Sequence, residues 1–188
     1  MNILIKVYTA SVETIKDEDK RLKQQQFVDA FGGIYEHSAW VAEQAFANGP
    51  PESLTQEQLC AALRAEVDAS GEQAQLILLR AHPDLAGKLA VSGELTAEST
   101  AEQASAGIDQ CTPEQFARFQ TLNTRYVEKF GFPFIMAVKG SDRHQILAAF
   151  ESRVNNDKDT EFRTALAQVH KIAELRIQTW LQTQGADA

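Results

Sequence analysis

Arg176 is a basic side chain placed within an apolar helical stripe. It follows Val169 by seven residues and Ala173 by three, and it precedes Trp180 by four. At about 100° per residue these positions share one helix face, which predicts that Arg176 points inward. Because an unpaired interior charge is costly, a buried arginine needs an anionic partner. Three interpretations stay open: an ion pair with an internal Asp or Glu, a site for a ligand carboxylate that fits the planar fork, or a helix that is shorter or turned differently.

His82 is the second residue with a plausible chemical task. Pro83 removes it from the α region, so a helix must end near Ala81 and place His82 at its carboxyl end. The helix dipole there favours the imidazolium, which suits a proton donor near neutral pH. The alternative is that His82 only caps helix carbonyl groups.

Glu102 has the same ambiguity as His82, between a chemical role and a structural one. Ser99 precedes it by three residues, which is the spacing of a capping box, so a helix is predicted to begin at Ser99 with Glu102 in its first turn. In that position Glu102 has a purely local structural role. Gln103 beside it would ordinarily be a solvated helix residue.

Other chemical groups form no recognisable constellation. His37, His144 and His170 lack H-E-x-x-H or i, i+4 spacing, so no metal site is predicted. Cys60 and Cys111 do not form a C-x-x-C pair and are expected to be reduced thiols of a cytoplasmic protein. Asn123, on an aromatic helix face, is expected to be a core amide with its hydrogen bonds satisfied.

Charge and hydropathy exclude some partners. The 188 residues include 26 acidic and 18 basic side chains, with a formal net charge of -8. A nucleic acid is therefore not expected as a partner, since phosphate backbones need clustered Lys and Arg. No apolar run approaches the roughly 20 residues of a membrane span, so no membrane association is expected.

The elements needed to position these residues are helices. Alternating β-branched runs are nearly absent, so we predict an all-α, single-domain bundle of roughly eight helices over residues 1–188, with 1–25 an uncertain lead-in. The helices are expected at about 19–31, after Ser38 to Asn48, from Thr55 to about Asp68, after Gly71 to Ala81, from Ser99 to about Asp109, after the cap Thr112 to Gly131, around Ile146 to Val154, and at about 159–181. Residues 84–98 are expected to form a mobile loop. On the helix after Thr112, one face is expected to carry Phe116, Phe119, Asn123, Tyr126, Val127 and Phe130.

Four sequence blocks and a final helix segment carry a resemblance to a known family. They are G-G-I-Y-E-H-S-A-W-V-A-E at 32–43, A-H-P-D-L-A-G-K at 81–88, S-T-A-E-Q at 99–103 and N-T-R-Y-V-E-K-F-G-F-P-F-I at 123–135, with I-A-E-L-R-I at 172–177. In this order they resemble 2-oxo-4-hydroxy-4-carboxy-5-ureidoimidazoline (OHCU) decarboxylase, an enzyme of urate breakdown. The first 25 residues differ from the usual lead-in of the family.

The resemblance implies an all-helical, homodimeric enzyme without metal or organic cofactor. It removes the substrate carboxyl group as CO2 and leaves (S)-allantoin. It also implies a catalytic site of His82 with Glu102 and Arg176 beside it. From the chemistry of the reaction we expect His82 to be the proton donor, held and tuned by Glu102. The implied substrate contacts are Pro83, Ser99, Glu102, Gln103, Phe134, Ile135, Met136, Ala137 and Val138, and we expect backbone N–H groups around Ile135 to Val138 to hold the ureido and ring oxygens.

Two other functions remain as alternatives. One is a non-catalytic helical interaction module in which Arg176 and Glu102 form an internal pair. The other is the same scaffold acting on a related ureido acid.

Overall fold

The computed structural model describes residues 19–49, 55–86 and 95–186, with side chains described to 183. Its elements are a helix over 19–31, then α2 (Trp40–Asn48), α3 (Gln56–Ala69), α4 (Glu72–Arg80), α6 (Ala97–Ser105), the 3₁₀ helix η1 (Ile108–Gln110), α7 (Pro113–Phe130), α8 (Arg143–Arg153) and α9 (Lys158–Ala186). No strand occurs in these ranges, and the predicted all-α class is confirmed. Most of the uncertain lead-in and of the 84–98 loop lies outside the described residues.

Local sequence signals explain most helix boundaries. Thr55 and Thr112 each form a complete capping box, with Gln58 and Gln115 respectively, and Pro113 occupies the first turn of α7. Gly131 ends α7 in the left-handed conformation, at φ 78°. These predicted starts and stops are confirmed.

The start of α6 differs from the prediction. Thr96, not Ser99, is the N-cap, and its hydroxyl accepts a hydrogen bond from the Ser99 N–H. Ser99 therefore lies inside the helix and is buried. Glu102 is then one turn further along than the first turn, so its predicted capping role is wrong. The helix also ends earlier than predicted, at Ser105, because Gly107 takes a left-handed conformation before η1.

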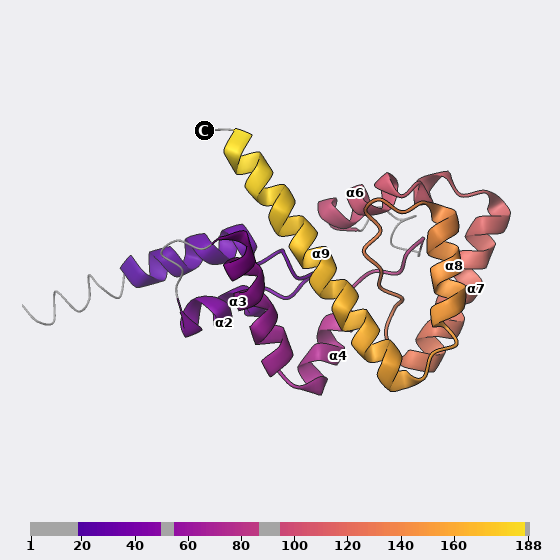
Figure 1. Cartoon of the computed structure of the whole chain (residues 1–188), viewed down its shortest axis with the longest axis horizontal. Coiled ribbons are helices and arrows are strands. Elements are labelled where there is room, and N and C mark those ends of the chain that lie inside the picture. The colour runs from indigo at the N-terminus through magenta and orange to yellow at the C-terminus, as the bar shows by residue number, and fades with distance from the viewer. Residues whose placement is uncertain (1–18, 50–54, 87–94, 187–188) are drawn as a thin grey trace, which may run out of the picture.

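The long helix α9 crosses the molecule and joins its two groups of helices (Figure 1). It contacts α3 and α4 on one side and α7 on the other. An extended segment over 131–138 connects α7 to α8 and lies between these helices and α9. Helix α9 therefore brings together residues from both halves of the chain.

An aromatic cluster anchors the second group of helices. Tyr126 and Phe119 from α7 pack with Phe150 of α8, and the Phe134 ring stacks on Phe150 at 3.9 Å. The predicted aromatic face of α7 is partly wrong: Phe116 and Val127 are 36% and 42% exposed. Leu122 lies in the core with Tyr126, so the buried stripe is rotated toward position 122.

Candidate active site

A pocket lies where the end of α4, helix α6, the 131–138 segment and α9 meet. Its walls are formed by His82, Pro83, Leu85, Ser99, Glu102, Gln103, Phe134, Ile135, Met136, Val138, Ile172 and Arg176. The structure thus brings together the site residues named from the sequence, with one exception. Ala137 is not in the wall, and its N–H donates to Gln168 Oε1 at 3.0 Å.

Arg176 extends from α9 into the polar end of this pocket, and its predicted burial is confirmed at 8% exposure. Its Nε and Nη2 donate to the two carboxylate oxygens of Glu102 at 2.8 and 3.0 Å. Its Nη1 donates to Glu36 Oε2 at 2.7 Å, and Nη2 also reaches Ser99 Oγ at 3.3 Å. The planar fork is therefore occupied by Glu102, and one Nη1 hydrogen has no acceptor among the described residues.

Glu36 is a buried partner of Arg176 that the sequence interpretation missed. It is 2% exposed, and its Oε1 accepts hydrogen bonds from Thr96 at 2.9 Å and Ser99 at 3.0 Å. Burial alone would raise the pKa of this carboxyl, but the charge and hydrogen bonds of Arg176, with the two hydroxyls, lower it. The available signal was its place within the E-H-S-A-W block, where it lies in a turn without helical periodicity.

His82 has a fixed orientation and a defined tautomer. Its Nδ1 lies 2.9 Å from the Leu78 carbonyl oxygen, which only accepts hydrogen bonds, so Nδ1 carries the hydrogen. Among the described residues, none forms a hydrogen bond with Nε2, and His82 lines the pocket. Burial lowers the pKa of His82 below its usual value of 6.5, and this outweighs the helix-end effect that was expected to favour the imidazolium.

Glu102 does not hold His82 in this structure. Both of its oxygens bind Arg176, and the imidazole is oriented by the α4 backbone instead. The expected carboxylate–histidine pair is thus replaced by a carboxylate–arginine pair. His82 is left as a neutral base in an apolar wall, beside a separate charged cluster of Glu36, Glu102 and Arg176.

Side-chain amides hold the backbone that follows His82. Gln103 Oε1 accepts the Ala86 N–H at 3.1 Å, and Gln120 donates to the Ala86 carbonyl at 2.6 Å. Asn123 donates to the Leu85 carbonyl at 2.9 Å, but its Oδ1 has no partner among the described residues, so the amide is only half satisfied. These contacts fix Ala86 at φ 51°, a conformation that is uncommon without glycine.

The 131–138 segment supplies backbone donors. No described residue accepts a hydrogen bond from the N–H groups of Ile135, Met136 or Val138, although all three residues line the pocket. Such groups suit a ligand with several carbonyl oxygens.

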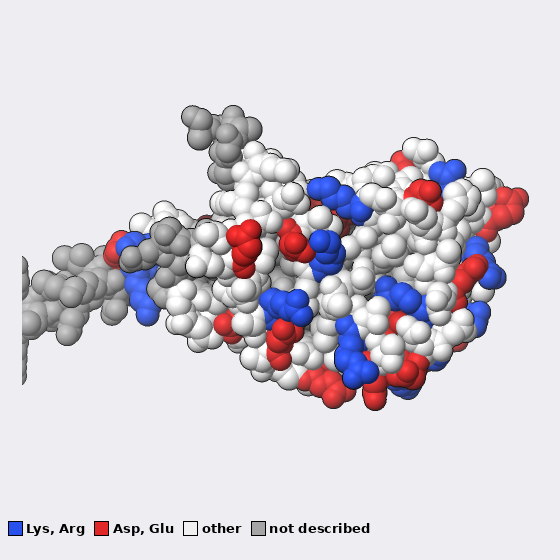
Figure 2. Space-filling model, viewed as in Figure 1, with Lys and Arg blue, Asp and Glu red and all other residues white. Residues whose placement is uncertain are grey.

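Surface charge, possible metal-ligand groups and helix hydropathy bear on binding to nucleic acids, metal ions and membranes. On the face shown in Figure 2, acidic and basic side chains are interspersed, without a continuous basic patch. Within the described ranges, no group of three or more His, Cys, Asp or Glu side chains is placed to hold a metal ion. None of the described helices is both long and apolar enough to cross a membrane.

Comparisons with known proteins agree on one family. The family model described as OHCU decarboxylase matches residues 20–178. The chain is 50% identical over 157 residues to an OHCU decarboxylase of Haloferax volcanii, covering 84% of this chain and 90% of that protein. It is 45% identical to the OHCU decarboxylase of Halalkalicoccus jeotgali, covering 89% of this chain and 90% of that protein.

A solved structure gives the same result for the fold. The chain superposes on a crystal structure of (S)-allantoin synthase with a TM-score of 0.67 and 36% identity. The match covers 84% of this chain and 50% of the other.

Proposed function

This chain belongs to the OHCU decarboxylase family, and from that premise we propose that it removes the carboxyl group of OHCU as CO2 and leaves (S)-allantoin, the last step from urate to allantoin. The observation that carries the proposal is the pocket whose wall contains His82, Glu102 and Arg176, with Arg176 also paired to the buried Glu36. A neutral base beside a fixed charge cluster is suited to proton transfer coupled to loss of a carboxylate.

The substrate itself can accept the electrons of the breaking bond. As the bond from C4 to the carboxyl group breaks, its electron pair moves into the ring toward the adjacent C=N nitrogen, and CO2 leaves. An enol with a C4–C5 double bond remains. No organic cofactor is needed as an electron sink in this proposal.

His82 manages the remaining protons. Its neutral Nε2 takes the proton of the 4-hydroxyl group, which becomes the C4 carbonyl, and the resulting imidazolium delivers a proton to C5. The ring nitrogen takes one proton from solvent, which balances the loss of CO2 from a carboxylate. Because His82 lies on one wall only, protonation from that side gives one enantiomer.

The other wall residues bind and orient. In this proposal, the second Nη1 hydrogen of Arg176 and the side-chain amide of Gln103 bind substrate oxygens, which their positions in or beside the pocket wall support. The N–H groups of Ile135, Met136 and Val138 are placed to bind the ring and ureido carbonyls, where charge develops. Glu102 holds the guanidinium while remaining partly open to the pocket, at 28% side-chain exposure.

The product's handedness tests the reaction. Freshly generated OHCU is mixed with the protein, and circular dichroism follows the optical activity of the allantoin formed. We expect (S)-allantoin to appear faster than the spontaneous racemic product. Equal rates with a racemic product would overturn the proposal, and a panel of related ureido acids separates this substrate from its analogues.

Single substitutions test the proposed catalytic roles. His82→Ala and Glu102→Ala should lose turnover while the protein stays folded, since neither removes a cation from the buried cluster. Circular dichroism in the far ultraviolet checks the fold. Turnover at the wild-type level in either variant would remove the role given to that residue.

We also propose a cytoplasmic homodimer. Leu22 and Leu181 are 59% and 38% exposed on the helix over 19–31 and on α9, and these two helices meet through Phe31 and Trp180 at 4.7 Å. Exposed leucines on two packed helices are where we place the contact with a second copy. The two free thiols, Cys60 and Cys111, suit a reducing compartment. Sedimentation analysis of the wild type and of the Leu181→Glu variant checks the dimer, and cell fractionation checks the compartment.

A further inference from the structure

A second buried ion pair lies outside the pocket and has no part in the reaction as described above. Glu161 of α9 has no exposed side-chain surface, and Arg153 of α8 is 13% exposed. Arg153 donates to Glu161 Oε1 through Nε at 2.8 Å and Nη2 at 2.5 Å. Tyr126 donates to the same oxygen, and Asn156 donates to Oε2 at 2.7 Å. Glu161 therefore fixes one edge of the Arg153 guanidinium.

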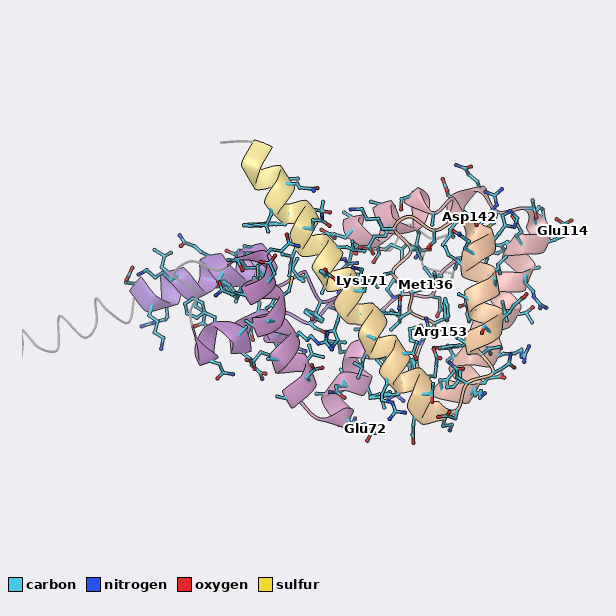
Figure 3. The ribbon with its side chains drawn as sticks, viewed as in Figure 1. Glu72, Glu114, Met136, Asp142, Arg153 and Lys171 are labelled. Atoms are coloured by element: carbon cyan, nitrogen blue, oxygen red, sulfur yellow. The ribbon has the colours of Figure 1, made fainter. Side chains whose placement is uncertain are left out.

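The other edge of that guanidinium holds the pocket segment. Arg153 Nη1 donates to the Ile135 carbonyl oxygen at 2.8 Å, and its Cζ lies 4.5 Å from the centre of the Phe134 ring. In Figure 3, Arg153 and Met136 both lie between α8 and α9. The ion pair is thus connected directly to two residues of the pocket wall.

The hydrogen bond from Arg153 to the Ile135 carbonyl also fixes the orientation of the Ile135–Met136 peptide. In a trans peptide the carbonyl of one residue and the N–H of the next point in opposite directions. No cis peptide occurs in the described residues, so the Ile135 carbonyl that points to Arg153 directs the Met136 N–H the other way. The next peptide is fixed separately, because the Ala137 N–H donates to Gln168 of α9. The Met136 N–H has no described acceptor and belongs to a residue of the pocket wall.

We infer that Arg153 is a positioning residue for the decarboxylation, which locks the Ile135–Met136 peptide so that the Met136 N–H is a preset donor to a substrate oxygen. This inference rests on the proposed function. Lysine cannot replace arginine here, because one ammonium group lacks the fork that binds Glu161 and Ile135 together. A preset donor is most useful where negative charge develops, so its loss should affect the transition state more than the bound substrate.

The test variant is Arg153→Lys, which keeps a cation beside Glu161. We expect kcat to fall about 10- to 100-fold, with KM changed much less, since misplacement of a group by about 1 Å can cost that much. The matched control is Arg118→Lys, because Arg118 forms an exposed pair with Glu151 at 2.8 Å that does not contact the pocket. A core control, Ile146→Val, lowers stability on α8 and keeps Arg153 with its hydrogen bonds to Glu161 and Ile135.

A ligand-free measurement separates this inference from the proposed function. In ¹H–¹⁵N spectra, the Met136 amide resonance should shift in Arg153→Lys and stay in place in both controls. If the wild type does not turn over OHCU, the proposed function fails, and the Met136 resonance still decides the positioning role. An unmoved resonance, wild-type kcat in Arg153→Lys, or a loss of activity no larger than Ile146→Val causes at equal folded fraction would each overturn the inference.

Discussion

Replacing Arg176 by methionine is the most direct perturbation of the charge cluster. The substitution keeps much of the apolar stem and removes the only cation that contacts Glu36 or Glu102 in the described structure. If the cluster were a dispensable structural pair in an interaction module, Arg176→Met would be tolerated or stabilising. The geometry predicts the opposite, because two carboxylates share one guanidinium.

The size of the effect follows from burial. Glu36 has 1% side-chain exposure, so it cannot turn toward water when its partner is removed. Breaking a buried pair by removing one partner costs about 3–5 kcal/mol. For a chain of this size, 1 kcal/mol corresponds to roughly 2–4 °C, so we expect Tm to fall by about 6–20 °C at pH 7.

The loss should shrink as the pH falls. In the wild type the pKa of Glu36 is lowered, so its contribution is complete above the unfolded pKa and is lost as pH falls through the folded pKa. In Arg176→Met, burial without a cation raises that pKa above its unfolded value, so the native state binds more protons and the variant gains stability as pH falls. The two stability curves should therefore converge in acid.

Thermal and urea unfolding between pH 4 and 8 measure these differences. Arg118→Met is the matched control, since Arg118 and Glu151 are also 2.8 Å apart but 53% and 45% exposed, and exposed pairs contribute about 0–1 kcal/mol. Adding Glu36→Gln and Glu102→Gln to Arg176→Met should restore most of the stability. An Arg176→Met protein as stable as Arg118→Met at pH 7 would refute the reasoning.

Three further predictions concern the base, its neighbours and the α6 cap. Because burial holds the pKa of His82 below 6.5 and the neutral form is the base, kcat/KM should be level near pH 7–8 and fall as pH decreases through that pKa; a rise in acid would contradict this. Glu102→Gln should lower kcat/KM at least about tenfold with a smaller Tm loss than Arg176→Met, because Glu36 still pairs with Arg176; unchanged kinetics would exclude Glu102 from the reaction. Thr96→Ala should destabilise by about 1–2 kcal/mol in urea unfolding, since it removes the cap and a hydrogen bond to Glu36, whereas Thr100→Ala should change stability by less than about 0.5 kcal/mol.

Sequence reasoning worked best where one local pattern decides the structure. The 3.6-residue period placed Arg176 inward, and single Thr caps fixed the starts of α3 and α7. The start of α6 was missed because T-A-E-S-T-A-E offers two candidate N-caps, Thr96 and Ser99, and only Ser99 stands three residues before a glutamate, as a capping box requires. The outcome depends on Glu36, which binds both hydroxyls from a distant turn and stabilises the earlier start.

The interactions inside the pocket were harder to predict than the residues that line it. The wall residues follow from the family resemblance, but the pairing of Glu102 with Arg176 instead of His82 is set by tertiary packing. The direction of the His82 pKa shift was missed for the same reason. The sequence shows the helix end, and therefore the dipole, but it does not show the burial of the side chain, which lowers the pKa more than the dipole raises it. Glu36 left no periodic signal, since it lies outside any helix.

The bond between Glu36 and Arg176 joins residues 140 positions apart, and the bond from Glu102 spans 74. At about 5–20 residues per second, a ribosome that has made Glu102 needs about 4–15 s more to add Arg176. During that interval both carboxylates lack their counter-ion, and the polar end of the pocket cannot close. We therefore expect a nascent or shortened chain without Arg176 to have a less stable, more protease-accessible pocket region.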